Sequence, residues 1–133
     1  MPVVALALRA SNGRVLMHRR PFEKAHGGLW EFPGGKVEAG EHPVIALVRE
    51  ISEELAVGID PSHLEPVGFA QTTVDGAAPP IVILLYACTA WTGELTSQEG
   101  GAIGWFDEAE VKALDKPPLD IMLADQLFAK SPR

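Results

Sequence analysis

Residues 34–58 read GGKVEAGEHPVIALVREISEELAVG, and this stretch predicts one helix, at 43–55, that is apolar on one side and acidic on the other. The apolar residues recur at the spacing of one helical face, which would pack on a core. Pro43 suits a first helical turn, and Glu41 or His42 would stand beside the helix start as a cap or dipole partner. The apolar face consists of Val44, Leu47, Val48, Ile51 and Leu55.

Three glutamates occupy the opposite face of this predicted helix. Glu50, Glu53 and Glu54 are spaced i, i+3 and i+4, which places their Cβ atoms within about 5–6 Å of one another. Arg49 can pair with Glu53 but cannot neutralise all three carboxylates. Clustered carboxylates suit hard divalent cations such as Mg²⁺, which keep positions open for water and substrate phosphates. An acidic helix face is also commonly just a solvated surface, so the helix alone leaves both interpretations open.

The whole stretch resembles the signature of the Nudix hydrolase family, in which Gly, Glu, Arg-Glu and Glu-Glu recur at fixed spacing. Every specified position agrees in type except Ala56, which stands where the family has Gly. Because that Gly normally helps to end the helix, we expect the helix to continue and to stop at Gly58. The positions compared are Gly35, Glu41, Arg49, Glu50, Ile51, Glu53, Glu54, Ala56 and Val57.

Length and composition favour one globular domain over residues 1–133, with 47% apolar residues. No apolar run approaches the roughly 20 residues that span a bilayer, and the apolar N-terminal segment lacks a preceding basic segment. Cys88 is the sole cysteine, so no internal disulfide can form, and a reducing compartment is expected. We therefore expect a cytoplasmic protein without membrane contact.

The net charge of −7 argues against binding of long nucleic acid, because such affinity comes mainly from Lys and Arg. A small phosphorylated substrate is compatible with this charge, since cations held on acidic residues make a repulsive surface attractive. The expected partner is therefore a small nucleotide. We expect a monomer or a weak homodimer.

Four β-rich runs are predicted in the rest of the chain before residue 92. Runs 2–9 and 14–20 flank Asn12-Gly13, a strong hairpin signal, so these two strands should pair antiparallel. Runs 66–73 and 81–91 are joined by a turn-rich segment. The run at 81–91 is nearly all apolar, which favours a central strand buried on both faces.

A short strand and two helices are predicted after residue 101. The strand is expected at 102–106, and Asp107 with Glu110 resembles a capping box for a short helix that ends at Leu114. A terminal helix is expected at 119–129. Together these elements predict an α+β protein, an α/β/α sandwich with a mixed sheet, which the Nudix resemblance also implies.

The passage WEFPGGK at 30–36 resembles the MutT-like branch of the family, whose members act on nucleoside triphosphates. This resemblance implies that Gly35 offers its backbone carbonyl to a metal ion. It implies that Lys36 contacts substrate phosphate and that Glu31 and Phe32 contact the substrate.

Further candidate residues lie outside the signature. Arg20 would end the second strand, where a guanidinium suits phosphate binding, although a surface residue is equally compatible. Glu99 matches a downstream glutamate that MutT-like enzymes bring to the metal cluster; the alternative is a solvated loop carboxylate. Asp120 resembles the position at which these enzymes read the base, and it also suits a helix N-terminus. A carboxylate accepts hydrogen bonds from guanine, cytosine or adenine alike, so Asp120 leaves the base open.

The resemblance implies an Mg²⁺-dependent nucleoside triphosphate pyrophosphohydrolase, with Mn²⁺ as a substitute ion. Glu53 or Glu99 would be the general base, and Arg49 would orient Glu53. Oxidised nucleotides such as 8-oxo-dGTP are possible substrates, which would mean a role in DNA repair. The expected metal ligands are Gly35, Glu50, Glu53, Glu54 and Glu99, and the expected catalytic residues are Arg49, Glu50, Glu53 and Glu99.

Two alternatives are open at this point. A nucleoside-diphosphate-sugar or dinucleotide hydrolase tends to carry a Pro or Tyr after the signature, where this chain has Thr73 and Asp75. A nucleotide-binding regulator without catalysis would be expected to have lost signature carboxylates, and this chain keeps Glu50, Glu53 and Glu54.

Overall fold

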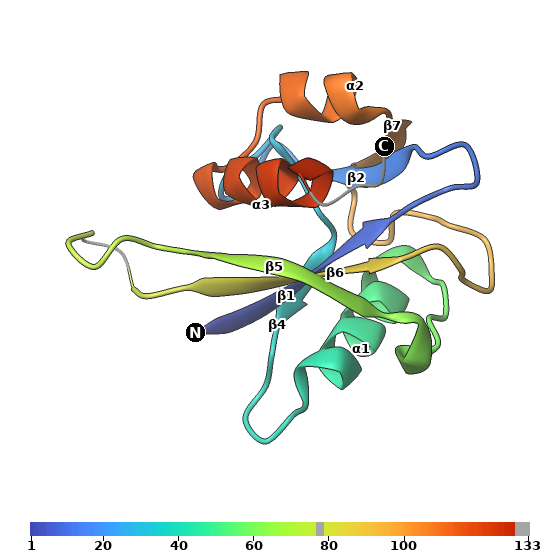
Figure 1. The fold of residues 1–133 in the computed structure, drawn as a ribbon, viewed down its shortest axis with the longest axis horizontal. Helices are drawn as coiled ribbons and strands as arrows, with labels where there is room; N and C mark the ends of the chain where they lie inside the picture. The colour runs from blue at the N-terminus through green and yellow to red at the C-terminus, as the bar shows by residue number, and fades with distance from the viewer. Residues whose placement is uncertain (77–78, 130–133) are drawn as a thin grey trace.

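Two β-sheets form the middle of the molecule, with helix α1 on one side and helices α2 and α3 on the other (Figure 1). The computed structural model describes residues 1–76 and 79–129. Within those residues, one sheet has the strand order β4-β1-β6-β5 and the other has the order β3-β2-β7. The elements are β1 (Pro2–Leu8), β2 (Val15–Arg19), β3 (Trp30–Glu31), β4 (Gly34–Lys36), α1 (Pro43–Leu55), a 3₁₀ turn (Pro61–His63), β5 (Glu65–Gln71), β6 (Val82–Cys88), β7 (Ala102–Phe106), α2 (Glu108–Ala113) and α3 (Pro118–Ala129).

The larger sheet is mixed, because β1 runs parallel to β6 and antiparallel to β4, while β5 runs antiparallel to β6. The predicted α+β architecture with a mixed sheet between helical layers is confirmed. Among the described residues, no helix has both the length and the apolar character that crossing a bilayer requires.

Strand β1 separates two hydrophobic cores. Successive side chains of a strand point to opposite faces, and this strand is apolar on both. Val4, Leu6 and Leu8 pack in the core that α1 covers, whereas Ala5 and Ala7 pack in the core that α2 and α3 cover. The strand therefore holds both helical layers in place.

The predicted hairpin between 2–9 and 14–20 is wrong. Strands β1 and β2 belong to different sheets, and the ladder expected between them is reduced to the bridge between Arg9 and Val15. The Asn-Gly signal does produce a tight turn, in which Gly13 adopts a positive φ of 86°. The strands then diverge because β1 pairs with β4 and β6, while β2 pairs with β3 and β7.

Strand β6 lies between β1 and β5, as its apolar sequence predicted. Ile83 and Leu85 contribute to one core, and Leu84 and Cys88 contribute to the other. Several of its side chains are half-buried, so the expected full burial holds only in part. The strand at 102–106 and the capping box of α2 are confirmed.

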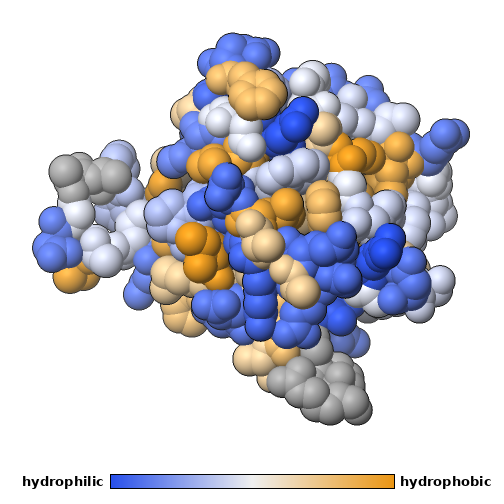
Figure 2. Space-filling view, turned by 90° about the horizontal axis from the view of Figure 1, so that it is seen from above, coloured by the Kyte–Doolittle hydropathy of each residue, from blue (hydrophilic) through white to orange (hydrophobic). Residues whose placement is uncertain are grey.

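Helix α3 packs on the larger sheet through the core, and the side-chain amide of Gln126 also joins it to the outer strand β5. Gln126 accepts a hydrogen bond from the backbone N–H of Phe69 at 3.0 Å and donates to its carbonyl at 2.7 Å. A Cβ atom at Gly68 would collide with the same amide. On the face seen in Figure 2, the apolar residues form separate groups between polar ones. The core packing and the amide contact together position α3, whose first turn carries Asp120.

Helix α1 begins at Pro43, as predicted, after His42, whose Nδ1 accepts a hydrogen bond from the N–H of Val44. The expectation that it runs on to Gly58 is wrong. It ends at Leu55, because Ala56 itself adopts the left-handed conformation, with φ 61° and ψ 29°. The turn lets Gly58 exchange two backbone hydrogen bonds with Thr92.

Replacement of Ala56 by Gly should stabilise the protein. A left-handed conformation costs an L-residue roughly 1 kcal/mol or more, and Gly would remove this strain. Part of the resulting stabilisation is lost, because Gly has a larger conformational entropy in the unfolded chain. We expect the free energy of unfolding in urea to rise by about 0.5–1 kcal/mol. As the matched control, Ala109→Gly in helix α2 should lower it, and equal losses in the two variants would contradict the prediction.

Candidate active site

An acidic cavity of about 130 Å³ lies beside the last two turns of α1. Glu50 and Glu54 reach it from the helix, Glu31 from β3, and Glu99 from the loop before β7. The structure thus brings together three of the predicted metal-binding side chains, including the loop residue Glu99. The full lining is His18, Arg20, Pro21, Lys24, Glu31, Gly34, Glu50, Glu54 and Glu99.

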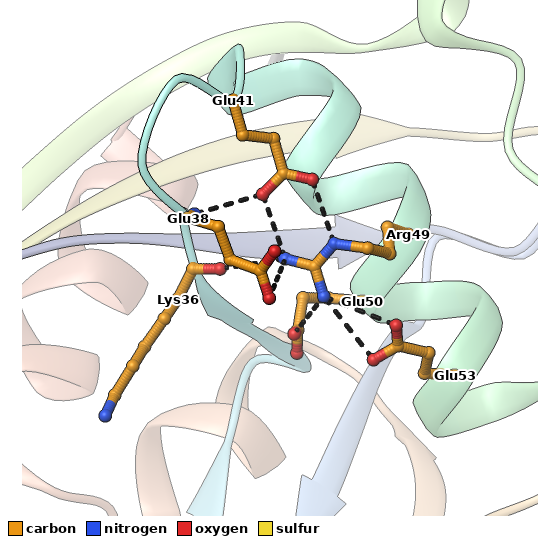
Figure 3. A network of polar contacts seen from close by, with 6 residues as sticks. All are labelled: Lys36, Glu38, Glu41, Arg49, Glu50 and Glu53. Atoms are coloured by element: carbon orange, nitrogen blue, oxygen red, sulfur yellow. Dashed lines mark hydrogen bonds and ion pairs between the residues drawn. The ribbon is translucent and has the colours of Figure 1, made fainter.

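Arg49 is the centre of a network of polar contacts that includes Glu50, a lining residue of this cavity, and that forms the cavity's rim (Figure 3). Its guanidinium donates to both oxygens of Glu41 at 2.9 and 3.0 Å and to Glu50 at 2.8 Å. It also donates to the backbone carbonyl of Lys36 at 3.1 Å. Hydrogen bonds from Arg49 lower the pKa of Glu41 to about 2, and those with Glu41 raise the pKa of Arg49. The predicted partner Glu53 is present but more distant, at 3.3 Å.

Glu53 does not line the cavity. Its side chain is 59% exposed and turns toward Arg49. Among the described residues, no group of three or more His, Cys, Asp or Glu side chains is already arranged around one metal position. The expected convergence of the three helical glutamates is therefore incomplete in this structure, because Arg49 attracts Glu50 and Glu53.

Burial dominates the charge state of the inner carboxylates. Glu54 is 8% exposed, and desolvation raises its pKa to about 8, helped by repulsion from Glu31, Glu99 and Glu50. Desolvation also raises the pKa of Glu50. Glu54 consequently retains its proton near neutral pH. A cation bound in the cavity would favour the ionised form of this carboxyl group.

Strand β4 approaches the acidic cavity with backbone alone. A Cβ atom at Gly35 would overlap the carboxylate of Glu50, and one at Gly34 would overlap the backbone carbonyl of Val4. Gly34 therefore requires glycine for its close approach to the backbone of β1, whereas a side chain at Gly35 would force the carboxylate of Glu50 to move. The role of the Gly35 carbonyl as a metal ligand stays a prediction.

A second cavity, of about 250 Å³, adjoins the acidic one. Arg20, Glu31 and Gly34 line both cavities, and Arg20 Nη1 donates to Glu31 Oε1 at 2.9 Å at this junction. All of the predicted substrate-binding residues line the second cavity. Its full lining is Val3, Val4, Ala5, Arg20, Glu31, Phe32, Gly34, Gly35, Lys36, Ile83 and Asp120.

Asp120 is buried in this second cavity. Its Oδ2 accepts a hydrogen bond from the backbone N–H of Phe32 at 3.1 Å, and burial raises its pKa to about 7. The side chain of Phe32 is 3% exposed and belongs to the core beneath α3. Lys36 is exposed, and its side chain extends away from the Arg49 network in Figure 3.

Sequence reasoning assigned no role to His18, which is 4% exposed and lines the acidic cavity. Its Nδ1 lies 3.4 Å from Glu54 Oε1, outside hydrogen-bond geometry. Burial lowers the pKa of His18, so the ring is held in its neutral form. The alternation of side chains along the strand could have indicated this placement of His18, because Leu16 and His18 share one face of β2 and Leu16 is buried.

Comparison with known proteins identifies the family. The family profile of the NUDIX domain matches residues 1–126. This chain belongs to the NUDIX family. The Nudix resemblance predicted from the signature is thereby confirmed, despite Ala56.

Relatives of this Nudix hydrolase include the CTP pyrophosphohydrolase of Escherichia coli (strain K12), 36% identical over 128 residues, covering 95% of this chain and 90% of that protein. The 8-oxo-dGTP diphosphatase of the same strain is 33% identical over 111 residues, covering 84% and 83%. Both names describe hydrolases that act on acid anhydrides, the enzyme class predicted for this chain.

Solved structures agree with the Nudix assignment. The solution structure of the E. coli ORF135 protein superposes with a TM-score of 0.82 at 33% identity, covering 96% of this chain and 88% of that chain. The crystal structure of MutT NUDIX hydrolase from Burkholderia pseudomallei gives the same TM-score at 23% identity, covering 95% and 96%, which shows the shared fold.

Nudix hydrolases generally use divalent metal cations, and the residues of the acidic cavity fit such an ion. Carboxylate oxygens are the ligands that hard divalent cations prefer. Repulsion from Glu31, Glu99 and Glu50 adds to desolvation in raising the pKa of Glu54, and Gly35 has no side chain to occupy the place of the Glu50 carboxylate beside β4. A cation there would be met by Glu50, Glu54 and Glu99.

Glu54 should make the metal-free enzyme less stable as the pH rises. The native protein keeps this proton up to about pH 8, whereas the unfolded chain loses it near the usual pKa of 4.5. Between these values the native state binds more protons, so the free energy of unfolding falls with increasing pH. In EDTA, the difference in unfolding free energy between wild type and Glu54→Gln should decrease from pH 5 to pH 8, and a constant difference would contradict this expectation.

Gly35→Ala should weaken metal binding, because the new methyl group would displace the carboxylate of Glu50. We expect the dissociation constant for Mn²⁺, measured by calorimetry, to rise about tenfold or more. Gly76→Ala, in the turn after β5, is the matched control and should bind Mn²⁺ like the wild type. Equal affinity in the two variants would rule out close packing of Gly35 against a metal ligand.

Proposed function

We propose that this Nudix hydrolase converts nucleoside triphosphates to nucleoside monophosphate and pyrophosphate, using Mg²⁺, with Mn²⁺ as a substitute. The observation that carries the proposal is the pair of adjoining cavities, of which one is acidic and the other is lined by Asp120. Arg20 lines both, so its guanidinium would meet phosphate where the nucleoside and the triphosphate join.

The acidic cavity would take the phosphate chain. A divalent cation held by Glu50, Glu54 and Glu99, with Glu53 and the Gly35 carbonyl as further ligands, would polarise the phosphoryl oxygens. Lys36 and Arg20 would bind phosphate oxygens and stabilise the charge that develops during cleavage. Arg49 would orient Glu53 through the contact it already makes at 3.3 Å.

The reaction requires removal of one proton from the attacking water. Water would attack one of the two phosphorus atoms joined by the α–β bridging oxygen, that P–O bond would break, and the proton of the water would pass to the base. Nucleoside monophosphate and pyrophosphate would be released. Glu53 and Glu99 are the two candidate bases. Glu99 lines the cavity directly, whereas Glu53 would have to turn inward from the rim.

The nucleoside would enter the second cavity. Because one oxygen of Asp120 is engaged by Phe32, the other is the one available to a base. Glu31 adds a further acceptor to this lining, which favours bases that carry an exocyclic amino group. CTP and 8-oxo-dGTP, the named substrates of two relatives, both carry such a group. This supports the proposal, which includes oxidised nucleotides among the substrates.

A hydrolysis screen tests the proposed function. We expect pyrophosphate release with Mg²⁺ from dCTP, CTP or 8-oxo-dGTP, faster than from TTP or UTP and faster than cleavage of ADP-ribose. Faster ADP-ribose cleavage would favour a nucleoside-diphosphate-sugar hydrolase. Nucleotide binding without turnover, unchanged by Glu53→Gln, would favour a regulator.

Substitution of Glu99 tests whether this residue takes part in the reaction. If Glu99 is the base, Glu99→Gln should lower kcat by about 10²–10⁴-fold while the protein stays folded. Glu94→Gln is the matched control, because Glu94 lies in the same loop but does not line the cavity. A kcat for Glu99→Gln equal to that of the control would remove Glu99 from the mechanism and leave Glu53 as the candidate.

A further inference from the structure

His18 is placed inside the acidic cavity by the alternation of β2. Leu16 and His18 share the strand face that is directed toward α1, and Leu16 packs with the residues of that helix. Strand β2 is the middle strand of its sheet, with His18 opposite Glu31 on one side and Ile103 on the other. The backbone of His18 is therefore fixed on both edges.

One ring nitrogen of His18 has no hydrogen-bond partner among the described residues. This atom is Nδ1, which lies 3.4 Å from Glu54 Oε1. The other nitrogen, Nε2, lies 3.4 Å from the hydroxyl of Ser97. Buried polar atoms are nearly always paired, so an unpaired nitrogen that faces a carboxyl group calls for a physical reason.

The loop that carries Ser97 is itself anchored on the end of α1. Thr96 donates its backbone N–H to the carbonyl of Leu55, and Gln98 donates to that of Glu54, both at 3.0 Å. A Cβ atom at Gly101 would lie 2.8 Å from Nε2 of His18, so the loop packs closely on the ring. The imidazole thus stands between the carboxyl group of Glu54 and the segment that leads to Glu99.

We propose that His18 is a positioning residue for the metal site, which donates Nδ1–H to the carboxylate of Glu54 once a divalent cation is bound, while Nε2 accepts the hydroxyl proton of Ser97. The inference rests on the proposed function, because it assumes that Glu54 is a metal ligand. The hydrogen bond would fix one oxygen of Glu54, direct the other to the ion, and couple Glu54 to the loop that positions Glu99.

Metal binding without nucleotide tests the inference independently of catalysis. Calorimetric titration with Mn²⁺ should give a dissociation constant at least tenfold higher for His18→Leu than for wild type. His18→Gln, whose amide can donate in place of Nδ1, should recover much of the affinity, and Ser97→Ala should lose a smaller part. His63→Leu, in the exposed 3₁₀ turn, is the control and should bind like the wild type.

The outcomes separate this inference from the proposed function. Wild-type affinity in His18→Leu would overturn the role of His18 and leave the proposed metal site intact. A wild-type protein that binds no Mn²⁺ would overturn both. Turnover of nucleoside triphosphates, measured on the wild type alone, tests the proposed function without reference to His18.

A second measurement covers the case in which His18→Leu does not fold. Long-range ¹⁵N NMR of the wild-type protein with Mg²⁺ reports which ring nitrogen of His18 carries the proton. We expect a neutral ring protonated at Nδ1. Protonation at Nε2 alone, or at both nitrogens, would overturn the proposal, because the assigned hydrogen bonds need Nδ1 as donor and Nε2 as acceptor.

Discussion

The guanidinium of Arg49 is the contact on which the arrangement of the acidic cavity depends. It binds both oxygens of Glu41, the carboxylate of Glu50 and the backbone carbonyl of Lys36. These bonds hold the loop after β4 against helix α1, beside the point where Gly35 meets Glu50. Because one planar group serves all of these acceptors, the loop and the helix are positioned together.

Two effects offset the repulsion among the crowded carboxylates of the acidic cavity. At the rim, Arg49 supplies positive charge to Glu50 and Glu53. Deeper in, burial and repulsion keep a proton on Glu54. A divalent cation bound at the proposed site would attract the same oxygens and favour loss of the proton from Glu54. The ion pair with Arg49 accounts for the outward position of Glu53. That position is compatible with a role of Glu53 in metal binding.

Local patterns predicted the helices well and the strand pairing poorly. The helix at 43–55 and the capping box of α2 depend on contacts between residues three or four positions apart, which sequence spacing reveals. The Asn-Gly turn was also correctly located, but a turn does not choose the partners of its strands. The partners are determined by the backbone pairing of β1 with β4 and β6 and of β2 with β3 and β7. The end of α1 was misjudged at Ala56, where the pairing of Gly58 with Thr92 favours the left-handed turn.

The sequence by itself determined that three glutamates share one helix and that the chain carries the Nudix signature, because both follow from spacing along the chain. Only the tertiary structure decided that Glu53 turns outward to Arg49 while Glu54 turns inward to His18. The MutT resemblance predicted that Glu99 joins this site, and the structure places Glu99 with Glu54 in the lining of the acidic cavity. These placements depend on backbone bonds between the end of α1 and a distant loop, and on the face that β2 presents once its sheet is assembled. Contacts of this kind leave no periodic trace in a single sequence.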